Sequence, residues 1–258
     1  MRIAYLMASN GPKNFGTMRT LKYALEDANR IQKRFESQLC GFEVYTPKEG
    51  LAPKDVVYEL ETLCEKCSVG DTMLCYFSGH GILDNNGNLV LLWDDSSPDK
   101  LLTSAIRIDK IMNALQGCKA KNKLLLLDCC HAGAVAQLSG FKGTGEVILS
   151  DHIIPPDNYA VLVAAGRTDR ARELMEHQGG FFTSSICLAL SNEMVRADKD
   201  KDGRISLADL TAWVQECAAQ HNQENPDDVV PYPSILGKFR GDFYLTATVQ
   251  DWEPYEIP

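Results

Sequence analysis

Two apolar runs, each ending in a short cluster of reactive side chains, limit what this chain can fold into. The first run covers residues 72–77 and leads into Ser78–Gly81 (SGHG), and the second covers 124–127 and leads into Asp128–Gly133 (DCCHAG). Such runs, when broken by Gly and small polar residues, are typical of buried parallel strands, whose carboxyl ends deliver side chains into a crevice. One strand would deliver a histidine and the other a cysteine. Because an imidazole can take the proton of a neighbouring thiol, the pair indicates a cysteine hydrolase.

Strand patterns and helix patterns alternate along the rest of the chain. Helices are predicted over residues 20–38, 108–115 and 179–194. A further helix is predicted to begin at residue 53 and to end before Gly70. Strands are predicted over 3–8, 42–46, 72–77, 124–127 and 159–164, with a small hairpin at 81–83 and 89–93 and a last edge strand at 242–246. This alternation predicts an α/β fold, with a mainly parallel central sheet of about six strands and helices on both faces, in a single domain. The segments 134–157 and 166–178 are expected to be loops that hold substrate.

Composition excludes several classes of function. The 258 residues carry 26 basic and 35 acidic side chains, for a net charge of −9. No basic run could follow a phosphate backbone, so nucleic acid is not expected as a partner, whereas cationic substrates are. The apolar run at 3–8 is too short for a signal peptide or a membrane span. We therefore expect a soluble cytoplasmic protein that has no membrane partner.

Cysteine is frequent, with nine residues in the chain. An odd number without a secretion signal argues against a disulfide framework. Cys64 and Cys67 could form half of a zinc site, but the remaining ligands have no recognisable spacing. We prefer the interpretation of two cysteines one turn apart on a helix.

A second motif lies at Asp198–Asp209, which matches the twelve-residue EF-hand calcium loop. The predicted ligands are the carboxylates at positions 1, 3, 5 and 12 and a main-chain carbonyl at position 7: Asp198, Asp200, Asp202, Asp209 and Arg204. Helices are expected on either side, over 182–196 and 207–219. The acid at position 12 is Asp where Glu is usual, which weakens calcium affinity or admits magnesium. The alternative is a solvated acidic turn that caps helices. Calcium is the only cofactor predicted, in a structural or a regulatory role, and no organic cofactor is expected.

The segments Ser78–Gly81 and Asp128–Gly133 closely resemble the two motifs of the caspase-like cysteine peptidases, and in particular the metacaspase and bacterial caspase-homologue branch. The resemblance continues at residues 21–28, 179–183 and 241–245. Two positions depart from the family pattern, with cysteine at 129 and alanine at 132. The resemblance implies a caspase-like fold over residues 1–248, with the calcium loop inside it, followed by a tail at 249–258.

The same resemblance implies the catalytic roles. Cys130 would attack the scissile carbonyl, His80 would protonate the leaving amine, and the backbone amides of Gly81 and Cys130 would hold the oxyanion. Cys129 remains a competitor for the nucleophile. His131 is expected to point the other way, in an extended turn, and to be structural.

Specificity also follows from the resemblance. Members of the metacaspase branch cut after arginine or lysine through acidic side chains, and Asp27 and Asp128 fall on those positions, with Ser78 as a further lining residue. Carboxylates bind a guanidinium by bidentate hydrogen bonds. From the residues alone, Asp27 could equally be a solvated helix residue and Asp128 a turn cap.

These expectations combine into a cysteine endopeptidase that cuts protein or peptide substrates after Arg, then Lys. It would act in a regulated proteolytic, defence or cell-death-like pathway, with a protein activator of unknown identity. The alternatives are a catalytically silent caspase-like scaffold and a calcium-responsive binding module. Autoprocessing is a further hypothesis, at Lys142 or within 167–172.

Overall fold

The computed structural model describes residues 1–13, 15–16, 18–131, 159–164, 173–174, 179–191, 193–238 and 243–247. The hypothesised autoprocessing positions, Lys142 and residues 167–172, therefore lie outside the described residues. So do the predicted loop at 134–157, the tail at 249–258 and most of the loop at 166–178.

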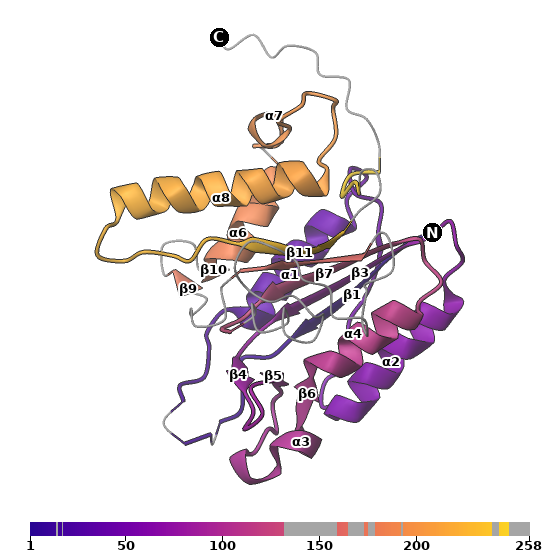
Figure 1. The fold of residues 1–258 in the computed structure, drawn as a ribbon, viewed down its shortest axis with the longest axis vertical. Helices are drawn as coiled ribbons and strands as arrows, with labels where there is room; N and C mark the ends of the chain where they lie inside the picture. Colours follow the sequence, from indigo (N-terminus) through magenta and orange to yellow (C-terminus); the bar gives the residue numbers. More distant parts are fainter. Residues whose placement is uncertain are drawn as a thin grey trace.

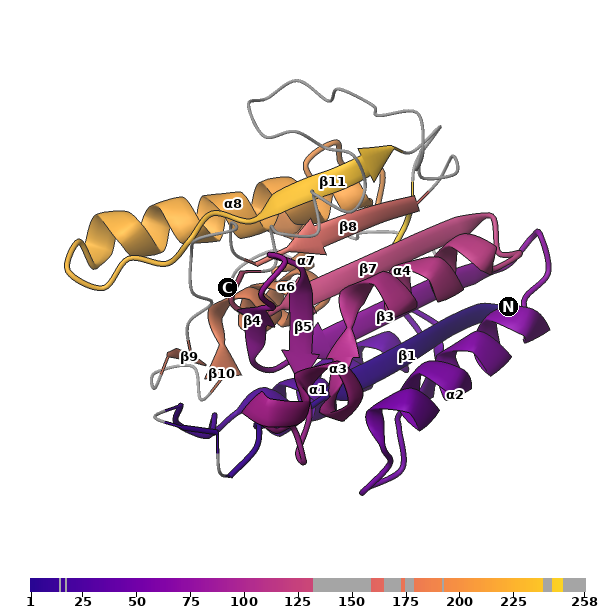
Figure 2. The same ribbon diagram turned by 60° about the horizontal axis from the view of Figure 1, so that its bottom comes forward.

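A six-stranded sheet forms the centre of the molecule (Figure 1). Its strands are β1 (Arg2–Ala8), β2 (Glu43–Tyr45), β3 (Thr72–Ser78), β7 (Asn122–Asp128), β8 (Tyr159–Val163) and β11 (Ser234–Lys238). They lie in the order β11-β8-β7-β3-β1-β2, and the run from β11 to β1 can be followed from top to bottom in Figure 2. All neighbours pair in parallel except β11, which is antiparallel to β8. The predicted α/β fold with a mainly parallel sheet is confirmed.

The three central strands end level with one another. Ala8 at the end of β1 pairs with Ser78 at the end of β3, and Ser78 pairs with Asp128 at the end of β7. β3 and β7 are apolar over most of their length, and all of their residues except Asn122 are buried, because helices cover both faces of the sheet. The residues that follow Ser78 and Asp128 therefore leave the sheet at the same edge.

Helices pack on both faces, as predicted. On one face, α2 (Pro53–Lys66) and α4 (Ile108–Gly117) share a buried cluster with alternate strand residues such as Met73, Cys75 and Leu125. On the other face, α1 (Ala24–Phe35), α6 (Phe181–Ala189) and α8 (Leu207–Glu224) pack against the intervening positions, such as Leu74 and Leu126. Figure 1 shows α2 and α4 on the opposite side of the sheet from α6 and α8.

Smaller elements complete the fold. The predicted hairpin is confirmed as β4 (Gly81–Leu83) and β5 (Leu89–Leu92), and β6 (Ala105–Arg107) extends it to three strands. A short helical segment, η1 (Pro98–Lys100), leads into α3 (Leu101–Ser104), and β9 (Glu173–Leu174) pairs with β10 (Gly179–Gly180). In the described part of the chain, no helix is both long enough and apolar enough to cross a membrane.

Three predicted elements differ from the structure. The sheet ends at β11 and not at 242–246, where the described residues form only an isolated bridge between Tyr244 and Ser206. The helix predicted over 179–194 stops at the end of α6, and a separate turn, α7 (Met194–Ala197), follows it. The first helix begins at Ala24 rather than at 20, because the preceding residues cross the edge of the sheet, where Leu21 N donates to Asn10 O at 2.8 Å.

Candidate active site

His80 follows the end of β3 by two residues and is half-buried. Its Nε2 lies 2.8 Å from the main-chain oxygen of Arg19. Gly11, with φ of +89°, lies so close to the ring that an added Cβ would be 2.6 Å from His80 Cδ2. The imidazole is thus held by a hydrogen bond to one nitrogen and by packing against a residue that has no side chain.

Cys130 follows the end of β7 by two residues and is half-buried, whereas Cys129 is fully buried in the core. Burial raises the pKa of the Cys129 thiol well above its usual value, with the neighbouring Cys130 and Asp128 adding to the effect. Gly81 packs directly against this turn, since a Cβ on it would lie 2.3 Å from the main-chain oxygen of Cys130. Of the two adjacent thiols, the more accessible one is Cys130.

His80 and Cys130 line one cavity of about 850 Å³. Its other walls include Gly81, Ile82 and the described residues 15–16 and 18–22. The register of β3 and β7 explains why His80 and Cys130 lie at the same cavity. His80 lies two positions after Ser78 and Cys130 two positions after Asp128, and these two strand ends pair with each other. The predicted catalytic pair is therefore brought together at one cavity.

The expectation of an extended turn that points His131 away from the site is wrong, while its expected structural role stays a prediction. His131 also lines this cavity, and its backbone is left-handed with φ of 57° rather than extended. Left-handed backbone is uncommon outside glycine, although histidine adopts it more readily than most residues. The turn after Cys130 therefore reverses sharply, which brings His131 back to the cavity wall.

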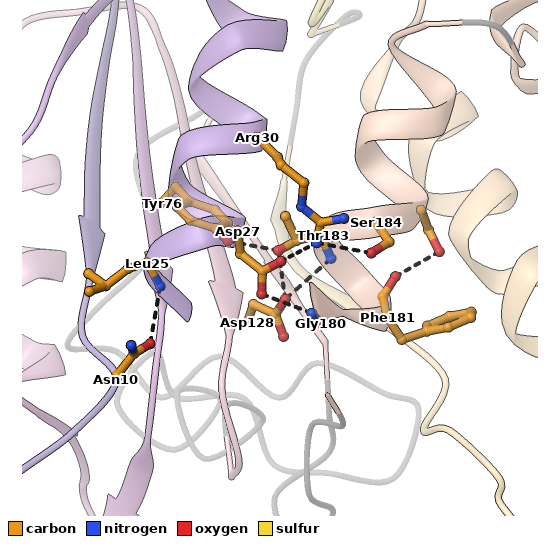
Figure 3. A network of polar contacts seen from close by, with 11 residues as sticks. Asn10, Leu25, Asp27, Arg30, Tyr76, Asp128, Gly180, Phe181, Thr183 and Ser184 are labelled. Carbon is orange, nitrogen blue, oxygen red and sulfur yellow. Dashed lines mark hydrogen bonds and ion pairs between the residues drawn. The ribbon is translucent and has the colours of Figure 1, made fainter. Parts of the chain in front are cut away.

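The predicted specificity residues Asp27 and Asp128 lie together beneath the β10–α6 turn (Figure 3). A Cβ on Gly180 would be 2.5 Å from Asp128 Oδ2 and 3.0 Å from Asp27 Oδ2. Gly180 N donates to Asp27 at 2.9 Å, while Thr183 donates to Asp128 from its hydroxyl at 2.6 Å and from its main chain at 3.2 Å. Asp27 is buried and not a solvated helix residue, so that alternative is wrong.

Ser78 is buried at the end of β3, two residues after Tyr76, which belongs to the same network. The Tyr76 hydroxyl is 2.7 Å from Thr183 Oγ1. Because Thr183 gives its hydrogen to Asp128, Tyr76 is the donor to Thr183. Burial, with the nearby Asp128 and Asp27, raises the pKa of Tyr76 well above its usual value, which keeps this donor protonated. None of the three predicted specificity residues lines the cavity of His80 and Cys130 among its described walls.

One cation already contacts this acidic pair. Arg30, one turn along α1 from Asp27, forms an ion pair with its Oδ1 and donates to Ser184 Oγ at 3.3 Å. Figure 3 shows the Arg30 side chain reaching down from α1 toward Asp27. Sequence reasoning missed Arg30, Thr183 and Tyr76, although the i, i+3 spacing of Asp27 and Arg30 on a helix could have indicated the ion pair.

The predicted calcium loop has three of its carboxylates close together. Oxygens of Asp198, Asp200 and Asp202 lie within 4.8 Å of one another. Lys201 and Gly203 are left-handed, with φ of 61° and 81°, and this folds the loop around the cluster. Gly203 N donates to Asp198 Oδ2 at 2.8 Å, which ties the loop across its centre. Carboxylates gathered in this way supply the oxygen ligands that calcium prefers.

Asp209 stands apart from that cluster. Its Oδ2 accepts from Ser206 N at 3.0 Å and its Oδ1 from Lys199 N at 2.9 Å, while Ser206 Oγ accepts from Asp209 N at 3.1 Å. This reciprocal capping box begins α8. The prediction of Asp209 as a ligand competes with this capping role.

The segment predicted as a last sheet strand pairs with the loop instead. Leu245 N donates to Ile205 O at 2.8 Å and Leu207 N to Phe243 O at 2.7 Å. Arg204, whose carbonyl is the predicted fifth ligand, directly precedes this short ladder. The end of the described chain thus anchors the loop against the helices.

All nine cysteines are free thiols. Cys64 and Cys67 lie at the end of α2 and are buried beside Cys118, whose thiol is 3.7 Å from the Cys64 carbonyl oxygen. Within the described residues, no set of three or more Cys, His, Asp or Glu side chains that includes them is arranged as a metal site. Their burial in the core agrees with the preferred interpretation.

The sheet order and the two helix layers define an α/β protein with the caspase-like fold. Among solved structures, the chain is similar to caspase-1 from Spodoptera frugiperda, with a TM-score of 0.63 over 95% of this chain and 89% of that chain. The identity is 14%, so this likeness concerns the fold. The caspase domain family matches residues 2–229, and the chain therefore belongs to that family of cysteine peptidases. No curated protein sequence matches it.

Proposed function

We propose that this protein is a cysteine endopeptidase that uses Cys130 as nucleophile and His80 as its acid–base partner. The observation that carries the proposal is that both residues line one cavity, with the imidazole held at Nε2 by the Arg19 carbonyl 2.8 Å away. A carbonyl can only accept, so Nε2 carries the hydrogen. In the neutral ring this leaves Nδ1 as the base for the thiol.

The proposed reaction begins when His80 takes the thiol proton and the Cys130 sulfur attacks the scissile carbonyl carbon. Negative charge then develops on the carbonyl oxygen, where the backbone amides of Gly81 and Cys130 would donate. The close approach of Gly81 to the Cys130 main chain supports this pairing, because a side chain at position 81 would push the two apart.

The second half of the reaction uses the same residues. The imidazolium gives its proton to the leaving amine as the C–N bond breaks, which leaves a thioester on Cys130. His80 then takes a proton from water, whose oxygen attacks the thioester and releases the acid product and the thiol. The Arg19 carbonyl stabilises the imidazolium at each stage, so no third carboxylate is needed.

For specificity, we propose cleavage after arginine and, more slowly, after lysine. Asp27 and Asp128 form a buried acidic pair, of which Asp128 directly precedes the Cys129–Cys130 turn in sequence, and Asp27 already binds the guanidinium of Arg30. A planar guanidinium can donate to two carboxylates at once, whereas an ammonium presents a single compact charge. This difference favours arginine.

A peptide panel tests both proposals. Fluorogenic peptides that differ only in the residue before the scissile bond are offered to the wild type, Cys130→Ala and His80→Ala. We expect turnover of the arginyl peptide, less of the lysyl peptide, and none by Cys130→Ala. Equal or faster turnover of an aspartyl peptide would refute the specificity, and unchanged turnover by Cys130→Ala would refute the nucleophile.

We also propose that the loop 198–209 binds calcium and stabilises the fold. The close approach of Asp198, Asp200 and Asp202 supports this, because like charges repel at that distance unless a cation lies between them. At calcium a hundredfold above its dissociation constant, the melting temperature should rise by about 5 °C relative to EDTA. An unchanged melting temperature would contradict the proposal.

A further inference from the structure

A second pocket, of about 340 Å³, lies between α1 and α6. Three basic side chains of α1 line one wall: Arg30, Lys33 and Arg34. Ser184 and Ser191, from α6 and the turn after it, contribute hydroxyls to the other. No carboxylate is among its described walls, although the chain as a whole carries a net charge of −9. The pocket is therefore a local concentration of positive charge on an acidic protein.

The spacing of the three basic residues along α1 places their side chains on the same wall of the pocket. Residues 30, 33 and 34 are three and four positions apart and so share one face of α1, where like charges repel each other. The helix dipole stabilises a cation in the last turn of a helix, which explains the presence of Lys33 and Arg34 there. It does not explain Arg30, which lies in the middle of α1. Among the described residues, no carboxylate lies within ion-pair distance of Lys33 or Arg34. Their charges are thus available to a ligand.

One hydroxyl of the pocket can donate a hydrogen bond to a ligand. Ser184 Oγ accepts from Arg30 at 3.3 Å, so its own O–H can point to a ligand oxygen, whereas the Ser191 hydroxyl already donates to the Cys187 carbonyl at 2.7 Å. Cys187, another lining residue, has its pKa raised to about 11 mainly by burial; the charges of Arg30 and Arg34 oppose that rise and the charge of Asp27 adds to it. The charges of both arginines therefore reach this wall of the pocket.

We propose that this pocket binds a small phosphate-class oxyanion, either inorganic phosphate or the phosphate group of a monoester, and that binding draws Arg30 away from Asp27. Guanidinium groups, an ammonium and a hydroxyl around one space match the tetrahedral oxygens of phosphate. The volume exceeds that of the ion, which leaves room for the substituent of a monoester.

The pocket is linked to Asp27 through the side chain of Arg30. The same terminal nitrogen of Arg30 contacts both Asp27 and Ser184, so Arg30 joins the acidic pair to the pocket. A phosphate oxygen competes with Asp27 for this guanidinium and frees the carboxylate to bind the basic side chain of a substrate. This second step rests on the proposed arginine specificity. The coupling is reciprocal, so bound substrate must strengthen phosphate binding equally.

Binding is tested without reference to activity. Melting temperatures of the full chain, as Cys130→Ala, are compared in chloride, inorganic phosphate and glycerol phosphate at equal ionic strength. The test variant combines Lys33→Gln with Arg34→Gln. The control combines Lys54→Gln with Lys66→Gln, two exposed lysines of α2 on the opposite face of the sheet.

We expect phosphate to raise the melting temperature of the parent and the control by at least about 2 °C and to leave the test variant unchanged. An equal rise in all three proteins would reflect general anion stabilisation and would overturn the proposal, as would no rise in any. A response to glycerol phosphate as well identifies the monoester group as sufficient, whereas a response to inorganic phosphate alone identifies the free ion.

Coupling is tested on the wild type with the arginyl peptide. Phosphate should lower KM about fivefold in the wild type and the control and have no effect in the test variant. An unchanged KM with binding intact would overturn the coupling and leave the pocket as a simple anion site. Absence of turnover under every condition would refute the proposed function and the coupling with it, while the melting temperatures would still decide the pocket.

Discussion

The main-chain carbonyl of Arg19 lies 2.8 Å from Nε2 of His80, so the imidazole of the proposed catalytic pair is oriented by a backbone group from a segment about sixty positions earlier in the chain. Because a carbonyl only accepts, that hydrogen bond places the hydrogen on Nε2 and leaves Nδ1 as the base in the proposed mechanism. The hydrogen bond depends on the present position of the ring, which is possible only because Gly11 beside it has no side chain.

Gly11→Ala should therefore impair catalysis. A Cβ at this position would meet His80 Cδ2 at 2.6 Å and would displace the ring. Because small misplacements of reacting groups are costly, we expect kcat for the arginyl peptide to fall on the order of 100-fold. Gly50→Ala is the matched control, since Gly50 also has a positive φ, of +74°, but an added Cβ would meet nothing within 4 Å. Equal loss in both variants would show that backbone strain, and not the ring, is responsible.

Substitution should distinguish the roles of the adjacent residues Cys129 and Cys130. Cys130→Ala is expected to abolish both turnover and labelling by an arginyl electrophile. Cys129→Ala removes a buried side chain from the core and should cost about 1–2 kcal/mol of stability while retaining labelling at Cys130. Mass spectrometry of the labelled peptide identifies the site, and label on Cys129 in the wild type would contradict the assignment.

Gly81→Ala tests the proposed oxyanion site. The new methyl group would lie 2.3 Å from the main-chain oxygen of Cys130, so β4 and the catalytic turn must move apart. We expect turnover to fall by about 100-fold or more, the usual cost of losing one oxyanion donor, together with a lower melting temperature. In Gly117→Ala, where an added Cβ meets nothing within 4 Å, both properties should stay near wild type.

The meeting of His80 and Cys130 at one cavity could be predicted from sequence, because the pairing of two strands brings them together. The apolar runs at 72–77 and 124–127 are buried on both faces, and the register that aligns Ser78 with Asp128 brings the second residue after each to one edge. The last strand could not be predicted in the same way. The residues 242–246 predicted a strand of the central sheet, but such a pattern does not identify the partner, which is here the loop at Ile205.

The sequence carried less information about β11 and about the support of the site. Gly237 in β11 has φ of +109° and packs against the Tyr159 carbonyl, features that weaken any strand pattern. The Arg19 carbonyl has no side-chain signature at all, since any residue supplies a carbonyl. Thr183 and Tyr76 resemble ordinary core residues until the positions of Asp27 and Asp128 are known. Backbone groups and long-range polar networks are properties of the tertiary structure.

Thr183→Val should destabilise the acidic pair. The change keeps the shape of the side chain but removes the donor to Asp128 and the acceptor for Tyr76. A buried polar group that loses its partner costs about 1–3 kcal/mol, so the urea midpoint should fall accordingly. KM for the arginyl peptide should also rise, because Asp128 loses its short hydrogen bond from the Thr183 hydroxyl and keeps only the one from the Thr183 main chain at 3.2 Å. Thr183→Ser keeps the hydroxyl and should restore KM; failure of this rescue would show that packing of the methyl group matters instead.

The two roles suggested for the loop 198–209 can be separated with Asp200 and Asp209. Asp200 is exposed and belongs to the carboxylate cluster, so Asp200→Ala should leave the melting temperature in EDTA unchanged and abolish the rise caused by calcium. Asp209 caps α8 through Ser206, and loss of a cap costs about 1 kcal/mol, which lowers the melting temperature by about 2–4 °C for a chain of this size. Asp209→Ala should therefore be less stable than wild type in EDTA, before any calcium is added. If Asp209→Ala instead matched the wild type in EDTA and lost only the calcium response, its carboxylate would be a ligand and not a cap.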